Sequence, residues 1–179
     1  RLLATTPPGR LAFTIFDPTG LGAGFAGLMH LADYEDALIN RRIWTQRDQM
    51  EERLGELNAH IEKVIQMYLR NDYETITQYN EQAGSVAEKY HFLVIADFPS
   101  GFSEVAIKRL QSIVSTGPRC GVYTLLHWDQ RLAQPDGMTA GDLREHSVRI
   151  VRDGEILKLA GGPEQEGVSL VLSPPPVQE

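Results

Sequence analysis

The sequence predicts an α/β fold, in which helices flank a largely parallel sheet and a small β-hairpin segment follows at the C-terminal end. Three short apolar runs, residues 11–16, 92–96 and 121–126, have the composition of buried strands. Segments of helical period separate these runs, so the order along the chain is strand, helix, strand, helix, strand. That alternation favours parallel pairing, because each helix carries the chain back to the same end of the sheet.

The first strand, residues 11–16, is rich in β-branched and aromatic side chains and stops at a turn that contains proline and glycine. Residues 42–45 predict a short second strand. Apolar residues then recur every three or four positions from Met50 to Tyr68, and the helix is expected to end at about Arg70. This period predicts one long helix that begins at Thr45, with Thr45 and Asp48 as its capping pair.

The same reasoning predicts the second half of the sheet. A shorter helix is expected over residues 73–82 and a longer one over residues 102–115, where apolar positions again follow the helical period. The runs at 92–96 and 121–126 are continuously apolar, as expected for strands that are buried on both faces.

The pattern changes in the C-terminal part of the chain. Residues 148–152 and 155–159 are rich in β-formers and flank Asp153-Gly154, which predicts a two-residue hairpin turn. Residues 168–172 are a candidate third strand. We therefore expect three parts: a core over residues 1–145 that is truncated at its N-terminus, a β-rich appendage over 146–172 and a proline-rich linker over 173–179.

Composition and charge exclude several classes of protein. Of the 179 residues, 42% are hydrophobic, which is enough for a packed core. No run approaches the ~18 consecutive apolar residues of a membrane span. Seventeen basic and 24 acidic residues give a net charge of −7, which argues against free-standing nucleic-acid binding. The single cysteine, Cys120, excludes an internal disulfide framework, and we expect a cytoplasmic chain, either free or on a membrane-anchored parent protein.

An acidic residue follows each of the three main strands: Asp17, Asp97 and Asp129. The carboxyl ends of parallel strands meet at one edge of a sheet, and ligands of α/β proteins bind there. Three carboxylates at that edge could hold a metal ion or a magnesium-bound phosphate. The alternative is that aspartate favours turns after strands because its side chain hydrogen-bonds the local backbone.

Other chemical motifs are absent or weak. Gly22, Gly24 and Gly27 match the spacing of a dinucleotide-binding loop, but Asp17-Pro18-Thr19 intervenes after the strand and no second strand with a terminal acid lies about 20 residues further on. None of the four lysines follows a glycine, so the 179 residues contain no P-loop. The five histidines lack metal-binding spacing, and Cys120 is expected to pack in the core rather than act as a nucleophile.

Several features nevertheless follow one another in an order that resembles a known family. They are Pro7-Pro8, the strand that ends in Asp17-Pro18-Thr19-Gly20, Gly27-Leu28-Met29-His30-Leu31, a long helix over 51–70, Tyr79-Asn80, and segments 91–98, 102–117 and 121–131. This order resembles the FtsK/SpoIIIE family of hexameric P-loop motors, which includes the type VII secretion ATPases. The resemblance covers about two thirds of the chain. It implies a RecA-like P-loop NTPase core.

The resemblance also implies what the intact proteins need. They use ATP and Mg²⁺, and their Walker A motif would lie upstream of Arg1. The chain begins with Arg1 rather than Met, and we expect it to be a piece of a longer polypeptide. On its own it is expected to bind neither cofactor. Its implied partners are other ATPase-like domains of the same protein, copies of itself in a ring, and DNA only within the full motor.

Two site residues, Asp97 and Gln130, carry over from the family pattern, and a third, Asp17, comes from its place at the strand edge. The family's Walker B motif ends in Asp-Glu. Aligning on Phe98 places Ala96 on the magnesium-holding aspartate and Asp97 on the glutamate, whereas a shift by one makes Asp97 the aspartate. Asp97 is thus the Walker B-like catalytic candidate in a degenerate motif, and Asp17 is a strand-edge candidate for cofactor binding. Gln130 resembles the family's sensor glutamine, although counting from Gly121 places Asp129 there.

Two functions follow as hypotheses. The first is a non-hydrolysing FtsK/SpoIIIE-like domain with an assembly or regulatory role in a larger motor. The second is part of an active ATP-driven DNA-translocating or secretion ATPase whose Walker A lies upstream. A dinucleotide oxidoreductase is a third class, and it would show cofactor absorbance in the purified protein.

Overall fold

The fold is described from a computed structural model. The structure describes residues 2–35, 38–39, 42–70, 72–154, 156–160 and 169–170. The chain divides into two compact units, residues 1–139 and 140–179.

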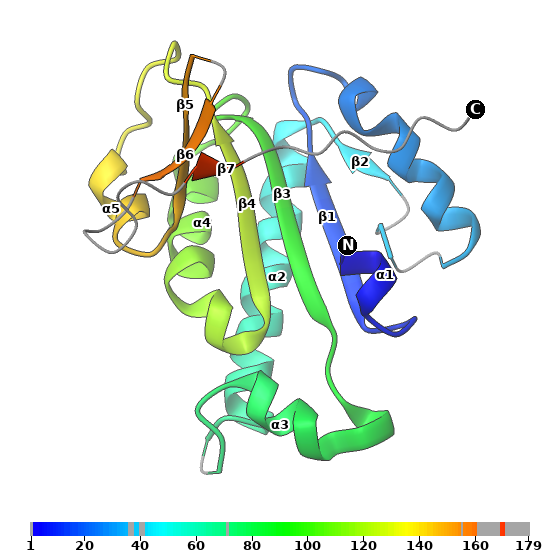
Figure 1. The fold of residues 1–179 in the computed structure, drawn as a ribbon. Helices are drawn as coiled ribbons and strands as arrows, with labels where there is room; N and C mark the ends of the chain where they lie inside the picture. Colours follow the sequence, from blue (N-terminus) through cyan, green and yellow to red (C-terminus); the bar gives the residue numbers. More distant parts are fainter. Residues whose placement is uncertain are drawn as a thin grey trace. The chain divides into compact units, whose positions relative to one another are not determined.

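The first unit is built on a four-stranded sheet in which every pair of neighbours is parallel (Figure 1). Its strand order is β2-β1-β3-β4. The strands are β1 (Leu11–Phe16), β2 (Ile43–Trp44), β3 (Tyr90–Phe98) and β4 (Val122–Trp128). The predicted α/β class and the parallel pairing are therefore confirmed.

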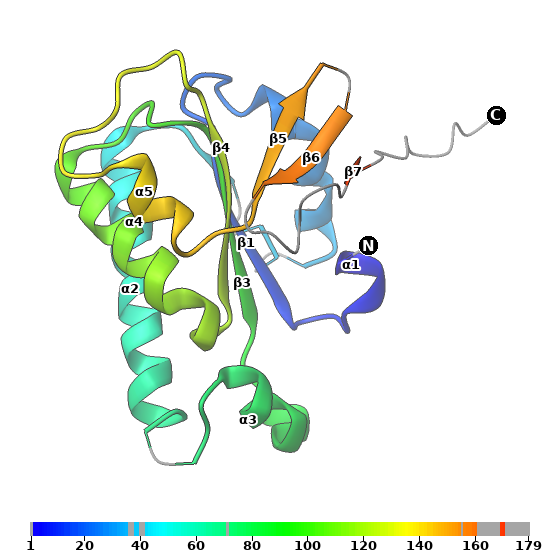
Figure 2. The ribbon, with the colours of Figure 1, turned by 60° about the vertical axis from the view of Figure 1, so that its left-hand side comes forward.

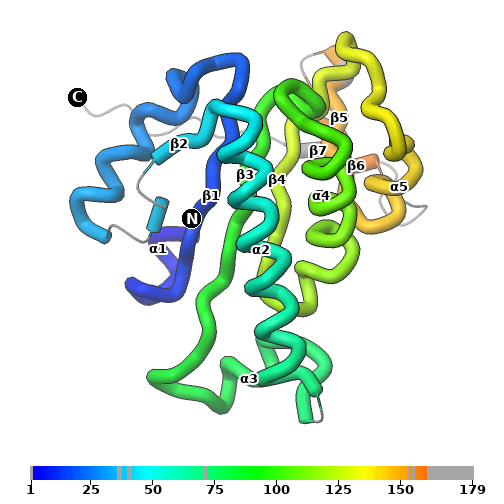
Figure 3. Tube along the Cα trace, turned by 180° about the vertical axis from the view of Figure 1, so that it is seen from behind, coloured from blue at the N-terminus to red at the C-terminus, as the bar shows by residue number. Residues whose placement is uncertain are grey.

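Two helices cover one face of this sheet, α2 (Arg47–Met67) and α4 (Glu104–Thr116), as Figures 2 and 3 show. The apolar stripe that predicted α2 is its buried face: Met50, Leu54, Leu57, Ile61 and Val64. On α4 the buried positions are Ala106, Ile107, Leu110 and Ile113. Each fully buried large side chain of this layer contributes about 1.5–3 kcal/mol to folding.

The opposite face carries irregular structure over β1. The 3₁₀ helix η1 (Ala23–Asp33) begins directly after Gly22 and contains Gly24 and Gly27, and a short helix α1 (Leu2–Thr5) precedes β1. Leu38 and Ile39 pack against Leu11 and Ile15 of β1, and these four residues form a buried cluster. Phe13, Phe92 and Tyr123 continue this face across three strands as stacked rings, with centroids 5.4 and 5.5 Å apart.

The helix starts differ from the predicted ones. The helix α2 begins at Arg47 after an extended Gln46 that makes no side-chain cap bond, so the predicted capping pair of Thr45 and Asp48 is wrong. A true capping box precedes α3 (Ile76–Ala83), where Thr75 and Gln78 each bond the other's backbone N–H. This box starts α3 three residues later than the predicted position 73.

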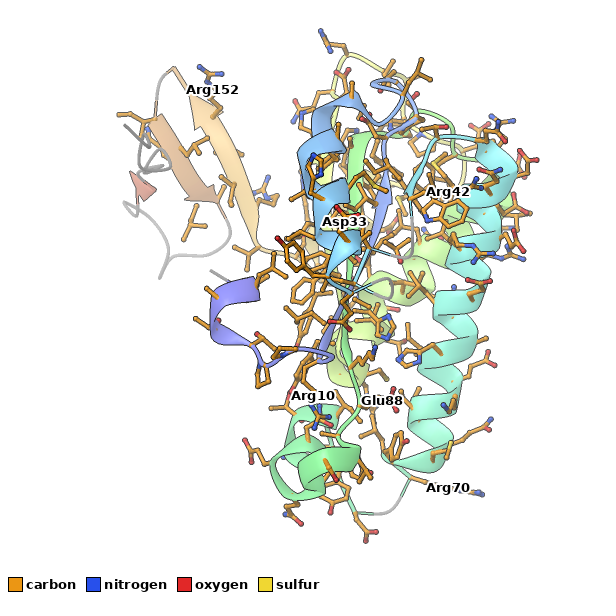
Figure 4. The ribbon with its side chains drawn as sticks, turned by 90° about the vertical axis from the view of Figure 1, so that its right-hand side faces the viewer. Arg10, Asp33, Arg42, Arg70, Glu88 and Arg152 are labelled. Carbon is orange, nitrogen blue, oxygen red and sulfur yellow. The ribbon has the colours of Figure 1, made fainter. Side chains whose placement is uncertain are left out.

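The segment between α3 and β3 is fastened by side chains to backbone groups. Asn80 bonds both the N–H and the C=O of Glu88, at 2.8 and 3.0 Å. The guanidinium of Arg10 donates to the carbonyls of Ala87 and Gly84, which closes the 3₁₀ turn η2 (Gly84–Val86) onto the start of β1. Figure 4 shows Arg10 and Glu88 at this α3 end of the unit, and Arg42 towards the opposite end of α2.

The second unit contains α5 (Ala140–Arg144) and a three-stranded antiparallel sheet in the order β5-β6-β7. Its strands are β5 (Arg149–Asp153), β6 (Ile156–Ala160) and β7 (Ser169–Leu170). The predicted hairpin is confirmed, although Asp153 pairs with Ile156 as a strand residue. The predicted linker over 173–179 lies outside the described residues.

The domain boundaries at 145 and 172 stay predictions.

Among the described helices, none combines the length and the apolar character that crossing a bilayer requires.

Ser103 provides a test of how α4 is anchored. Its hydroxyl accepts a bond from the Ala106 N–H at 3.0 Å and donates to the Glu51 carboxylate of α2. Removing both bonds in Ser103→Ala should lower the free energy of unfolding by about 1–2 kcal/mol. Urea denaturation followed by circular dichroism measures this change. The matched control is Ser112→Ala, at an exposed position of the same helix, which should be neutral or slightly stabilising. Equal effects of the two substitutions would contradict the capping role.

Candidate functional site at the carboxyl edge of the sheet

The three strand-edge aspartates lie at the same edge of the sheet, because β1, β3 and β4 run parallel. Two bonds tie their loops together. The Asp129 N–H donates to the Phe98 carbonyl at 2.9 Å, and the Thr19 hydroxyl donates to the Asp97 carboxylate. The edge is therefore one connected site, built from the loops that follow these three strands.

Asp17 is used by its own loop. Its carboxylate is buried, with one oxygen accepting from the Gly20 N–H at 2.9 Å and the other from the Gly22 N–H at 3.1 Å. Gly20 has to lack a side chain, because a Cβ there would lie 2.6 Å from both carboxylate oxygens. Gly22 has φ +84°, a conformation that favours glycine. The contacts of Asp17 are thus those of an aspartate that stabilises the turn after its strand, which was the alternative to ligand binding.

A β-bulge at the end of β3 sets the position of Asp97. Ile95 pairs with Leu126 and Phe98 pairs with Trp128, so Ala96 and Asp97 together oppose His127. Asp97 has φ +52°, in the left-handed region. The extra residue returns Phe98 to the helix-covered face, where its ring is fully buried and meets Phe102 and Trp128 edge-on.

The Asp97 carboxylate is held from two sides. Its Oδ1 lies 3.0 Å from Nδ1 of His127, and its Oδ2 accepts from the Thr19 hydroxyl. The Asp97 side chain is one-third exposed and the His127 ring is two-thirds exposed, so water reaches the pair. With Nδ1 protonated, His127 donates to the carboxylate and presents Nε2 to solvent.

Asp129 forms a closed pair with Arg131. The guanidinium donates from Nε to Oδ1 at 2.8 Å and from Nη2 to Oδ2 at 2.7 Å, and the Arg131 backbone N–H adds a bond to Oδ1 at 3.0 Å. These bonds from Arg131 lower the pKa of Asp129 to about 2. In the other direction, the hydrogen bond to Asp129 raises the pKa of Arg131.

Within the described residues, no group of three or more His, Cys, Asp or Glu side chains is arranged to hold a metal ion. Gln130 is exposed between Asp129 and Arg131, and its sensor-like role stays a prediction. Cys120 is buried, and burial raises the pKa of its thiol. The roles assigned to Asp97 and Asp17 also stay predictions.

Sequence reasoning missed two members of the site, Thr19 and His127. A signal for each was present: Thr19 follows Asp17-Pro18 in the first turn, and His127 lies two residues before Asp129. Nothing in the sequence linked either residue to Asp97, since the bond to Thr19 spans 78 positions and the bond to His127 spans 30.

Comparison with known proteins gives matches among solved structures only. No family model and no curated protein matches the sequence. The pCW3 conjugation coupling protein TcpA, in its monomer form with ATPγS, matches over 79% of this chain at 18% identity and a TM-score of 0.59. A structure of EssC from Geobacillus thermodenitrificans, containing ATPases 2 and 3, matches over 81% at 16% identity and a TM-score of 0.57.

Both neighbours are P-loop ATPases of the FtsK/HerA type, and at these identities they establish the fold of this chain. The predicted RecA-like P-loop NTPase core is thereby confirmed as a fold. The chain spans 40% of the length of the TcpA chain and 26% of the EssC chain.

The left-handed backbone of Asp97 leads to a test. Asparagine adopts this region readily and its amide can still bond Thr19 and His127, so Asp97→Asn should leave the stability nearly unchanged. Asp97→Ala loses both bonds and keeps the strained φ, and it should lower the free energy of unfolding by about 1–3 kcal/mol. Chemical denaturation of both variants decides the point. An alanine variant as stable as the asparagine variant would show that the bulge imposes no strain.

Proposed function

We propose that this chain is an ATPase-like domain that no longer hydrolyses ATP and that serves assembly or regulation within a larger motor protein. Its fold is that of motor ATPase domains from conjugation and secretion proteins. The observation that carries the proposal is that both carboxylate oxygens of Asp17, Asp97 and Asp129 lie within hydrogen-bonding distance of polar groups of this chain.

Phosphoryl transfer to water requires three kinds of group at this edge. Backbone amides and a lysine hold the phosphates, a hydroxyl and a carboxylate hold Mg²⁺, and a polar group orients the attacking water. The 179 residues contain no glycine-lysine step, so the first group is missing from this chain. Engaged carboxylates are poor magnesium ligands, because each internal bond must break before the oxygen can bind the ion.

The bulge in β3 bears on the two alternative alignments of the Walker B segment. Ala96 and Asp97 share one register position opposite His127, and Phe98 is buried among aromatic rings. Either alignment therefore leaves one carboxylate at the end of β3. The intact family pattern has two acidic residues there, so this feature supports the interpretation of a degenerate site.

The alternative function is that the chain forms part of an active ATP-driven translocating or secretion ATPase whose Walker A lies upstream. This alternative is supported by one of the structural neighbours, TcpA, whose structure was solved with ATPγS. Other ATPase-like domains of the same protein, copies of this chain in a ring, and DNA within the full motor are the proposed partners under either function. A cytoplasmic location is part of the same proposal.

Nucleotide binding separates the two functions. The chain should give no magnesium-dependent heat on calorimetric titration with ATP and no phosphate release above the buffer rate, because neither phosphates nor Mg²⁺ find a prepared site. Asp97→Asn is the matched control and should behave identically. A magnesium-dependent dissociation constant in the low micromolar range, abolished by Asp97→Asn, would overturn the proposal and favour an active site.

DNA binding gives a second test. The net charge of −7 leaves no electrostatic attraction to duplex DNA. At about 150 mM salt the isolated chain should bind a labelled duplex more weakly than the ~10⁻⁴–10⁻⁶ M of non-specific binders. Fluorescence anisotropy measures this affinity. Sub-micromolar binding that weakens steeply with added salt would contradict the prediction.

A further inference from the structure

Two histidine rings meet inside the first unit, where α2 packs on β3. His60 belongs to α2 and His91 to β3, and their ring centroids are 4.4 Å apart at an interplanar angle of 45°. The Nε2 atom of His60 is buried and has no hydrogen-bond partner among the residues that the structure describes. Neither residue takes part in the site at the carboxyl edge.

The positions of both rings follow from the periods of their elements. His91 is two residues before Leu93 and four before Ile95, so it shares their helix-covered face of the sheet. On α2, His60 lies three residues after Leu57 and four before Val64, along the buried stripe. The half-buried pair, which can take up protons, thus lies in line with buried hydrophobic positions on both elements.

Burial penalises the charged form of both rings. Desolvation, with the neighbouring His60 as the second cause, lowers the pKa of His91 to about 4. The pKa of His60 is also lowered, again mainly by burial. The charged groups that act on the pair are Glu88 and Lys89, which precede β3, and Lys63 on α2; Glu88 opposes the shift, and the two lysines add to it.

Glu88 also belongs to the contacts that hold α3. It accepts a hydrogen bond from the hydroxyl of Tyr68, whose ring lies 4.4 Å from that of Tyr79 on α3. Tyr79 in turn meets Tyr73 edge-on at 5.5 Å. The carboxylate that would attract a protonated histidine is thus the one that bonds this cluster of three tyrosines.

We propose that His60 and His91 form an acid-sensitive latch, which holds α3 and the C-terminal end of α2 on the sheet when both rings are neutral. Adding a proton to either ring places a cation in a buried layer beside a second imidazole. The cation then draws the Glu88 carboxylate away from Tyr68, and the tyrosine cluster with α3 is released. The site at the carboxyl edge stays folded, because no member of the pair contacts it.

The direction of the effect follows from linkage. Both histidines have a folded-state pKa below the ordinary 6.5, so the unfolded or released state binds more protons as the pH falls. The latch is fully closed above pH 6.5 and is progressively lost between pH 6.5 and about 4.

The structure supplies separate spectroscopic probes for the two ends of the sheet. Tyr68, Tyr73 and Tyr79 lie at the α3 end, whereas Trp44 and Trp128 are the last residues of β2 and β4, at the carboxyl edge. Near-ultraviolet circular dichroism resolves tyrosine from tryptophan bands. In a pH titration of the full 179-residue chain, the tyrosine band should decline between pH 6.5 and 4 while the tryptophan band persists. In parallel, NMR of the imidazole protons should show two of the five histidines with a pKa below 6.5, and His91 with a pKa of about 4.

Variants assign the effect to the pair. His60→Gln combined with His91→Phe removes both titrating rings and should flatten the tyrosine titration. His146→Gln changes an exposed histidine and should titrate like the wild type. Loss of both bands at one pH, normal titration of all five histidines, or a tyrosine transition that survives in the double variant would each overturn the latch. If the double variant does not fold, the order of the two bands and the histidine titrations of the wild type still decide.

Discussion

The bulge at the end of β3 is the constraint on which the carboxyl edge depends. The strand must deliver Phe98 to the core beneath α4, and a regular strand would place that ring on the opposite face. One extra residue solves the packing problem and leaves Asp97 in a left-handed conformation beside His127. The position of Asp97 at the site is therefore set by the burial of the Phe98 ring.

Engagement of carboxylates by internal donors gives the edge its character. Asp17 is held by backbone N–H groups, Asp97 by a hydroxyl and an imidazole, and Asp129 by a guanidinium. Each aspartate thus has a different kind of partner. A site that binds a cation instead leaves oxygens facing a common point. The parallel topology brings the three carboxylates to one edge, where Asp17 and Asp129 hold their own loops and Asp97 links its loop to Thr19 and His127.

Much of the fold could be predicted because apolar runs and helical stripes are local signals. Residues 11–16 and 92–96 formed strands, and the stripe from Met50 to Val64 formed the buried face of α2. The start of α2 could not be predicted from Thr45, because the backbone stays extended through Gln46 and the helix begins only at Arg47. The 3₁₀ helix η1 was missed for a similar reason, since its glycine and alanine residues carry no clear period.

The candidate site was predictable only in outline. That Asp17, Asp97 and Asp129 share an edge follows from parallel pairing, which the order of elements indicates. The pairing of Asp97 with His127 depends on strand register and on a bulge, and neither leaves a mark in local composition. The Asp129–Arg131 pair is local, and its spacing of two residues was visible in the sequence.

The space around Gly20 restricts how this sequence can change over time. Any side chain at position 20 would occupy the place of the Asp17 carboxylate, which lies 2.6 Å from the missing Cβ. A substitution of Gly20 is therefore tolerable only after position 17 has lost its carboxylate, and a substitution of Asp17 alone leaves the N–H groups of Gly20 and Gly22 without their acceptor. The two positions constrain each other, so single-step divergence at either one is blocked and descendants of this domain are expected to keep both or lose both.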